Sequence, residues 1–95
     1  MIALIEEKRE QLEELCRRFH VRRLSLFGSA LRDDFDPEKS DLDFLVDLEP
    51  GRTLFDLSGL LLDLEALLNT PVDVVTERGL RPRVRQRVLE EAVPL

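Results

Sequence analysis

The chain has 95 residues, a length that fits one small domain over residues 1–95 and leaves no room for a second hydrophobic core. Hydrophobic residues make up 43% and charged residues 36% of the sequence, a balance that excludes disordered and membrane-spanning classes. A net charge of −6 argues against direct nucleic-acid binding, because neutralising phosphates requires an excess of Lys and Arg.

The N-terminal third of the chain predicts a helix and then a strand. Between Ile5 and Phe19, apolar residues recur at helical spacing among Glu, Lys and Arg, which is typical of an amphipathic helix. The segment 23–27 alternates polar and apolar side chains and stops at Gly28. This pattern predicts a short first strand.

The next elements are a short helix, a loop and a second strand. Ser29 is placed to cap a helix that runs to about Arg32. Residues 33–40 are polar and contain a proline, which is typical of a loop. The segment 41–47 predicts a second strand that is apolar enough to lie in the centre of a sheet.

The remaining segments predict two more helices around a third strand. Thr53 stands three residues before Asp56, the spacing of a capping box, and the leucines from 54 to 68 form a broad apolar stripe. Residues 72–76 predict a third strand, and Pro82 introduces a last helix. The alternation predicts an α+β fold with a three-stranded mixed sheet and helices packed mainly on one face.

Three acidic residues on the second and third strands predict a metal site. Asp41 and Asp43 are one residue apart, so on a strand both carboxylates point to the same face, where they repel unless a cation compensates. Asp73 lies early in the third strand between two valines, and the three carboxylates converge if these strands are neighbours. Oxygen ligands of this type suit Mg²⁺ with a nucleoside triphosphate, and three acids support two metal ions. Asp73 is then the natural proton acceptor.

A phosphate site is predicted where the first strand ends. Gly28 lets the chain turn and approach a phosphate closely, and Ser29 adds a hydroxyl donor. Arg32 reaches the same anion, and Ser40 is placed to donate to a phosphate or to cap the loop. For these groups to face one metal site, the first two strands must be antiparallel and the second and third parallel. Each motif alone is common in turns and exposed strand edges, but their order favours a single site.

Two segments resemble the signature of the DNA polymerase β-like nucleotidyltransferases: Leu-Phe-Gly-Ser-Ala-Leu-Arg at 26–32 and Ser-Asp-Leu-Asp-Phe-Leu-Val at 40–46. The strand at 71–75 and the end of the chain at 87–95 are similar to those of the small prokaryotic minimal nucleotidyltransferases. Asp33 departs from the pattern, since many relatives have Gly there, and an added acid near the phosphate site would weaken nucleotide affinity. The resemblance covers nearly the whole chain and implies the polymerase β-like fold.

The resemblance also implies an activity: Mg²⁺-dependent transfer of AMP from ATP to a hydroxyl of a partner protein. That partner is commonly a HEPN-domain toxin, to which the minimal protein is the antitoxin. Gly28 and Ser29 would hold the triphosphate, Asp41 and Asp43 the metal ions, and Asp73 a metal ion and the proton. Two alternatives stay open, namely a non-catalytic nucleotide-binding antitoxin that acts by complex formation, and a small-molecule nucleotidyltransferase of the aminoglycoside-modifying kind.

The surroundings of the site are predicted only in outline. The chain offers little surface to enclose an acceptor, so we expect the partner to supply it. The arginine-rich last helix is either a docking face for that partner or for phosphate, or an exposed face whose arginines pair with neighbouring glutamates. The arginines of this region are Arg78 and Arg81 before Pro82, and Arg83, Arg85 and Arg87 after it. With no signal-peptide pattern and no long apolar run, we expect a cytoplasmic protein that does not enter a membrane.

Overall fold

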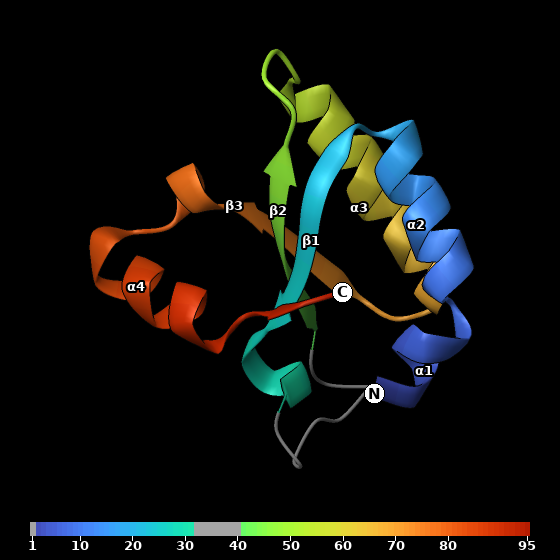
Figure 1. Cartoon of the computed structure of the whole chain (residues 1–95), viewed down its shortest axis with the longest axis horizontal. Coiled ribbons are helices and arrows are strands. Elements are labelled where there is room, and N and C mark those ends of the chain that lie inside the picture. Colours follow the sequence, from blue (N-terminus) through green and yellow to red (C-terminus); the bar gives the residue numbers. More distant parts are fainter. Residues whose placement is uncertain (1, 32–40) are drawn as a thin grey trace.

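A four-stranded mixed sheet organises the computed structural model, which describes residues 2–31 and 41–95. The strands lie in the order β3-β2-β1-β4 (Figure 1). Helices cover one face of this sheet, and the arrangement confirms the predicted polymerase β-like α+β class. No helix in the described ranges is long and apolar enough to cross a membrane.

The strand directions are those that the candidate site requires. Strand β1 (Val21–Phe27) pairs antiparallel with β2 (Leu42–Leu48), and β2 pairs parallel with β3 (Val72–Thr76). The prediction of three strands is wrong, because β4 (Val93–Pro94) adds to the free edge of β1. Val93 and Pro94 are too few to show the alternating pattern of a strand, and proline cannot donate a backbone hydrogen bond. They form a strand only because they pair with the edge of β1.

Three helices form the layer on the covered face: α1 (Ile2–Glu7), α2 (Arg9–Arg18) and α3 (Leu54–Leu68). The single helix predicted between Ile5 and Phe19 is interrupted at Lys8, whose N–H lies 3.2 Å from the carbonyl oxygens of both Leu4 and Ile5. Both pieces keep the amphipathic pattern, since Ile5 and Leu12 are buried. The interruption therefore leaves the packing of this layer intact.

The core lies between these helices and alternate residues of the central strand. Leu42, Phe44 and Val46 of β2 are buried against the helices. Their neighbours Asp43 and Leu45 therefore project from the opposite, uncovered face, because successive side chains of a strand alternate. The strand pattern thus places a carboxylate on the open face of the sheet.

Helix α3 begins with the predicted capping box. The Thr53 side chain accepts from the Phe55 N–H at 3.2 Å, and the Asp56 carboxylate accepts from the Thr53 N–H at 3.0 Å. We expect Thr53→Ala to cost about 1 kcal/mol, because it leaves an N–H of the first turn without its acceptor. A fall in Tm of roughly 4–8 °C in thermal unfolding would report that loss. Ser58→Ala, at an exposed position inside the same helix, is the control and should leave Tm within about 2 °C.

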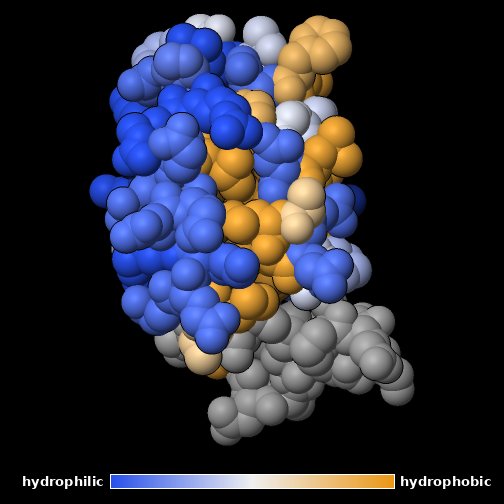
Figure 2. Space-filling view, turned by 90° about the vertical axis from the view of Figure 1, so that its right-hand side faces the viewer, coloured by the Kyte–Doolittle hydropathy of each residue, from blue (hydrophilic) through white to orange (hydrophobic). Residues whose placement is uncertain are grey.

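Helix α3 is apolar nearly all round, and one side of it stays exposed. Leu54, Phe55 and Leu62 are 78%, 89% and 65% exposed, respectively. Figure 2 looks onto the helical side of the molecule and shows apolar side chains between the polar ones. This helix therefore carries more apolar surface than the sheet and its neighbouring helices cover.

The last helix, α4 (Pro82–Glu91), lies apart from the other three (Figure 1). It begins with Pro at its first position, as predicted, and a short 3₁₀ helix, η2 (Glu77–Gly79), leads into it from β3. Val88 is buried but Val84 is 44% exposed, so the apolar side chains of this helix are covered only in part. Helix α4 flanks the open face of the sheet and leaves that face accessible.

Candidate functional site

Two of the three predicted acids are direct neighbours on the sheet. Asp43 and Asp73 are register partners on the parallel strands β2 and β3. Neighbouring strands lie about 4.8 Å apart, and partners at the same register project to the same face. The carboxylates of Asp43 and Asp73 therefore stand side by side on the open face, Asp43 half-buried and Asp73 exposed.

Together with burial and the charge of Asp73, the negative charge of the third acid, Asp41, raises the pKa of Asp43. Burial raises the pKa of Asp43 above its usual value of 3.8, and the negative charges of Asp73 and then Asp41 raise that pKa further. Asp41 lies exposed just before β2. The three carboxylates thus repel one another at one end of the sheet, an arrangement that a bound cation would relieve.

The raised pKa makes the stability of the protein depend on pH in a definite sense. Below pH 3.8 Asp43 is protonated in both the folded and the unfolded chain, so it carries no penalty. As the pH rises, Asp43 loses its proton in the unfolded chain at a lower pH than in the folded chain. Above that pH the unfavourable charge lowers the free energy of unfolding. We therefore expect Asp43→Asn to be more stable than the wild type at neutral pH without divalent cations, and the difference to vanish near pH 3. Thermal unfolding of both proteins across this range measures it; a difference that persists at pH 3 would contradict the electrostatic cause.

Gly28 brings the backbone of β1 against the Asp43 carboxylate. It directly follows Phe27, the register partner of Asp43, and has a φ of +76°, which L side chains rarely adopt. A Cβ at this position would lie 2.5 Å from Oδ2 of Asp43. The chain can therefore pass this close to the carboxylate only because position 28 has no side chain.

The short helix predicted after Gly28 begins at Gly28 itself, one residue before the predicted cap at Ser29, and is a 3₁₀ helix. This helix, η1 (Gly28–Leu31), has four residues, and Ser29 lies inside it instead of capping it. A helix this short has too small a macrodipole to attract a phosphate strongly. The case for phosphate binding here therefore rests on the close backbone approach at Gly28. The Ser29 side chain, Arg32, Asp33 and Ser40 lie outside what the structure describes.

The donor set fits a metal ion that is shared with a substrate. Within residues 2–31 and 41–95, no group of three or more His, Cys, Asp and Glu side chains converges to form a metal cage. Mg²⁺ does not need such a cage, because it usually binds through one or two carboxylates, water and substrate phosphates. The pair Asp43 and Asp73 meets that smaller requirement, with Asp41 adding negative charge nearby.

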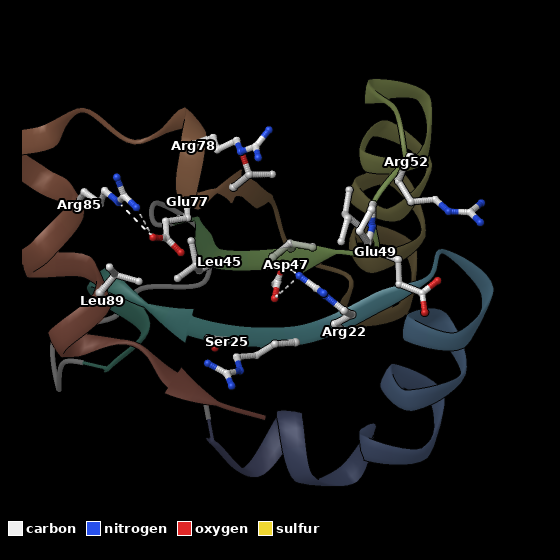
Figure 3. Close-up of a pocket in the computed structure, with 16 residues that line it drawn as sticks. Arg22, Ser25, Leu45, Asp47, Glu49, Arg52, Glu77, Arg78, Arg85 and Leu89 are labelled. Carbon is white, nitrogen blue, oxygen red and sulfur yellow. Dashed lines mark hydrogen bonds and ion pairs between the residues drawn. The ribbon is translucent and has the colours of Figure 1, made fainter.

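A cleft of about 630 Å³ continues the open face beyond the acids (Figure 3). Leu45 and Asp47 of β2 lie between Arg85 of α4 and Arg52, which follows β2. The arginine-rich pattern of the last helix predicts a role for Arg85. Arg52 could not be predicted in this way, because an isolated arginine after a turn is part of no pattern. Only the folded sheet brings such residues together.

Comparison with known proteins places the chain among nucleotidyltransferases. Residues 8–95 match the family model described as a nucleotidyltransferase domain. The protein adenylyltransferase MntA of Thermococcus cleftensis is 41% identical over 81 residues, which are 85% of this chain and 81% of that protein. A solved structure described as a candidate minimal nucleotidyltransferase has a TM-score of 0.83 at 49% identity, covering 96% of this chain and 92% of that one.

More distant solved structures share the fold. A toxin–antitoxin complex with AMP-PNP matches with a TM-score of 0.72 at 22% identity over 90% of this chain and 69% of that chain. The complex of a tri-AMPylated HEPN toxin of Shewanella oneidensis with its MNT antitoxin matches with a TM-score of 0.67 at 21% identity, over 94% of this chain and 69% of that chain. At these identities the likeness shows a common fold alone.

Proposed function

The chain belongs to the nucleotidyltransferase domain family, and from this premise we propose that it transfers AMP from Mg²⁺-bound ATP to a hydroxyl group of a partner protein. The partner that we propose is a HEPN-type toxin, for which this protein would be the antitoxin. The proposal rests on the pair Asp43 and Asp73, which lies beside the backbone of Gly28, a residue without a side chain. Protein adenylyl transfer is the activity named for the 41%-identical relative, and one chain of the tri-AMPylated toxin complex has the same fold.

Each residue of the site has a part in this reaction. Asp43 and Asp73 would hold magnesium together with Asp41, and the metal would supply positive charge against the triphosphate and the pentavalent transition state. Gly28 would let the backbone approach the phosphates, with the hydroxyl of Ser29 as an added donor. Asp73 would accept the proton of the attacking hydroxyl. The acceptor oxygen then bonds to the α-phosphorus, and the bond from that phosphorus to the pyrophosphate oxygen breaks.

Arg32 and Ser40 complete the proposed phosphate contacts. Arg32 follows η1 along the chain, and Ser40 directly precedes Asp41. An arginine and a hydroxyl are both suitable donors to phosphate oxygens. We therefore propose that they bind the triphosphate from either end of the segment between β1 and β2.

Transfer of a labelled nucleotide tests the proposed function directly. With α-labelled ATP, Mg²⁺ and the HEPN-type partner protein, we expect label on the partner, and none after chelation of the metal with EDTA. An Asp41→Asn, Asp43→Asn double variant should also leave the partner unlabelled. An unlabelled partner with the wild-type protein, or equal labelling by the double variant, would exclude the enzymatic reading.

The same assay separates the alternatives. A non-catalytic antitoxin would bind the partner and suppress its toxicity in both the wild type and the double variant. A small-molecule nucleotidyltransferase would label an aminoglycoside or a similar alcohol and leave the partner unlabelled. The paired acids at Asp43 and Asp73 favour catalysis over a non-catalytic antitoxin. The activity named for the 41%-identical relative favours a protein acceptor over a small molecule.

A further inference from the structure

The cleft beyond the acids carries positive charge that the rest of the fold does not neutralise. Five arginines line it against three acidic side chains, in a chain whose net charge is −6. The arginines come from β1, from the turn after β2, from the segment after β3 and from α4: Arg22, Arg23, Arg52, Arg78 and Arg85. The acids are Asp47, Glu49 and Glu77.

The three acids are already engaged by residues of the chain. Arg22 lies 3.1 Å from Asp47, and Arg85 makes an ion pair with Glu77. Glu49 lies 3.3 Å from Nδ1 of His20. Asp47 and Glu77 therefore each have an arginine partner, and the charge of Glu49 alone is left to face the other three cleft arginines.

The other three arginines, Arg23, Arg52 and Arg78, are exposed. None of their side chains makes an ion pair or a hydrogen bond with any residue in the described ranges. Three cations that face one cleft without partners repel one another, and the fold gains nothing from holding them there. An anionic ligand is the simplest compensation.

The position of the cleft indicates what kind of anionic ligand it binds. Asp43, Leu45 and Asp47 project from the same face of β2, and four residues of strand span about 13 Å. The cleft therefore begins beside the proposed site of transfer and continues away from it. An extended peptide whose hydroxyl lies at Asp43 and Asp73 would reach the arginines about three to five residues along its chain.

We propose that this cleft, lined by Arg23, Arg52 and Arg78, binds an acidic segment that flanks the accepting hydroxyl of the partner protein. The identity of the segment as part of the acceptor rests on the proposed function, whereas its acidic character rests on the cleft alone. The partially apolar floor at Leu45 and Leu89 suits the backbone and stems of a peptide. The site would select acceptors by the charge beside their hydroxyl.

The test is direct binding in the absence of ATP and Mg²⁺. A short fluorescein-labelled peptide rich in Glu should bind the wild type at low salt, as followed by anisotropy, and the matching peptide with Gln should not. The double variant Arg52→Gln, Arg78→Gln should bind about fivefold more weakly. The double variant Arg81→Gln, Arg83→Gln is the matched control, because these exposed arginines lie outside the cleft and removing them changes the net charge equally. It should bind within about twofold of the wild type.

If both double variants bind the Glu peptide equally weakly, the proposal would be overturned. The peptide would then be attracted by the arginines of the whole surface and not by those of the cleft. Tighter binding of a single-stranded oligonucleotide than of the Glu peptide, lost in the cleft variant, would overturn it as well. In the labelling assay the cleft variant should raise KM for the partner about fivefold and leave KM for ATP unchanged. A raised KM for ATP alone would assign the cleft to the nucleotide instead. If the partner is never labelled but the Glu peptide binds as expected, the proposed function fails and the acidic-ligand site stands.

Discussion

Replacing Asp43 by Asn should lower the rate of AMP transfer by about a thousandfold, the largest effect that we expect from one change in this chain. Asn keeps the shape of the side chain but removes the negative charge that would hold magnesium. The carboxylate lies at the centre of the site, since it is the register partner of Asp73 and touches the space left open at Gly28. Initial rates of label transfer at saturating Mg²⁺ and ATP measure the loss.

The loss of rate should occur without any loss of stability. Because burial and the neighbouring acids raise the pKa of Asp43, its charge opposes folding at neutral pH, and the Asn variant relieves this cost. A variant that is more stable and far less active marks a residue retained for function at the expense of the fold.

Asp63→Asn is the matched control for this change. Asp63 is an acid of α3, which covers the face of the sheet opposite the site, and its carboxylate makes an exposed ion pair with Arg18 at 3.2 Å. Removing an exposed ion pair costs at most about 1 kcal/mol, and the rate should stay within about twofold of the wild type. An Asp43→Asn protein that transfers AMP as fast as Asp63→Asn would exclude Asp43 from the metal site.

The central part of the fold could be predicted because its signals are local. The alternation of β2 separates buried residues such as Phe44 from Asp43, and the requirement of one metal site then fixes both strand directions. The capping box at Thr53 and the proline that opens α4 are similar cases, since each is a short pattern with one physical meaning.

Other features depend on partners that are distant in the sequence. Strand β4 exists because the edge of β1 accepts it at Ser25 and Leu26, and nothing in Val93–Pro94 itself predicts this. The interruption between α1 and α2 at Lys8 could not be predicted, because no glycine or proline lies at that point of the sequence. The close contact between Gly28 and Asp43 likewise follows from the register of two strands and not from either motif.

Gly28 should be the most sensitive position outside the acids. In Gly28→Ala the new Cβ would meet Oδ2 of Asp43 at 2.5 Å, and a φ of +76° disfavours any L side chain. The backbone strain should cost about 1–2 kcal/mol, and displacement of the carboxylate should lower the rate of transfer by about a hundredfold. Thermal unfolding measures the first effect and label transfer the second.

Gly51→Ala separates these two causes. Gly51 also has a positive φ, of +87°, but a Cβ there meets no heavy atom within 4 Å. The Gly51→Ala variant should therefore lose about 1–2 kcal/mol of stability, as Gly28→Ala does. Its rate of transfer should stay within about threefold of the wild type. If both alanine variants lose activity equally, strain in the backbone would account for the effect. If only Gly28→Ala loses it, the missing side chain at position 28 is what allows the Asp43 carboxylate to stand where a metal-bound phosphate would meet it.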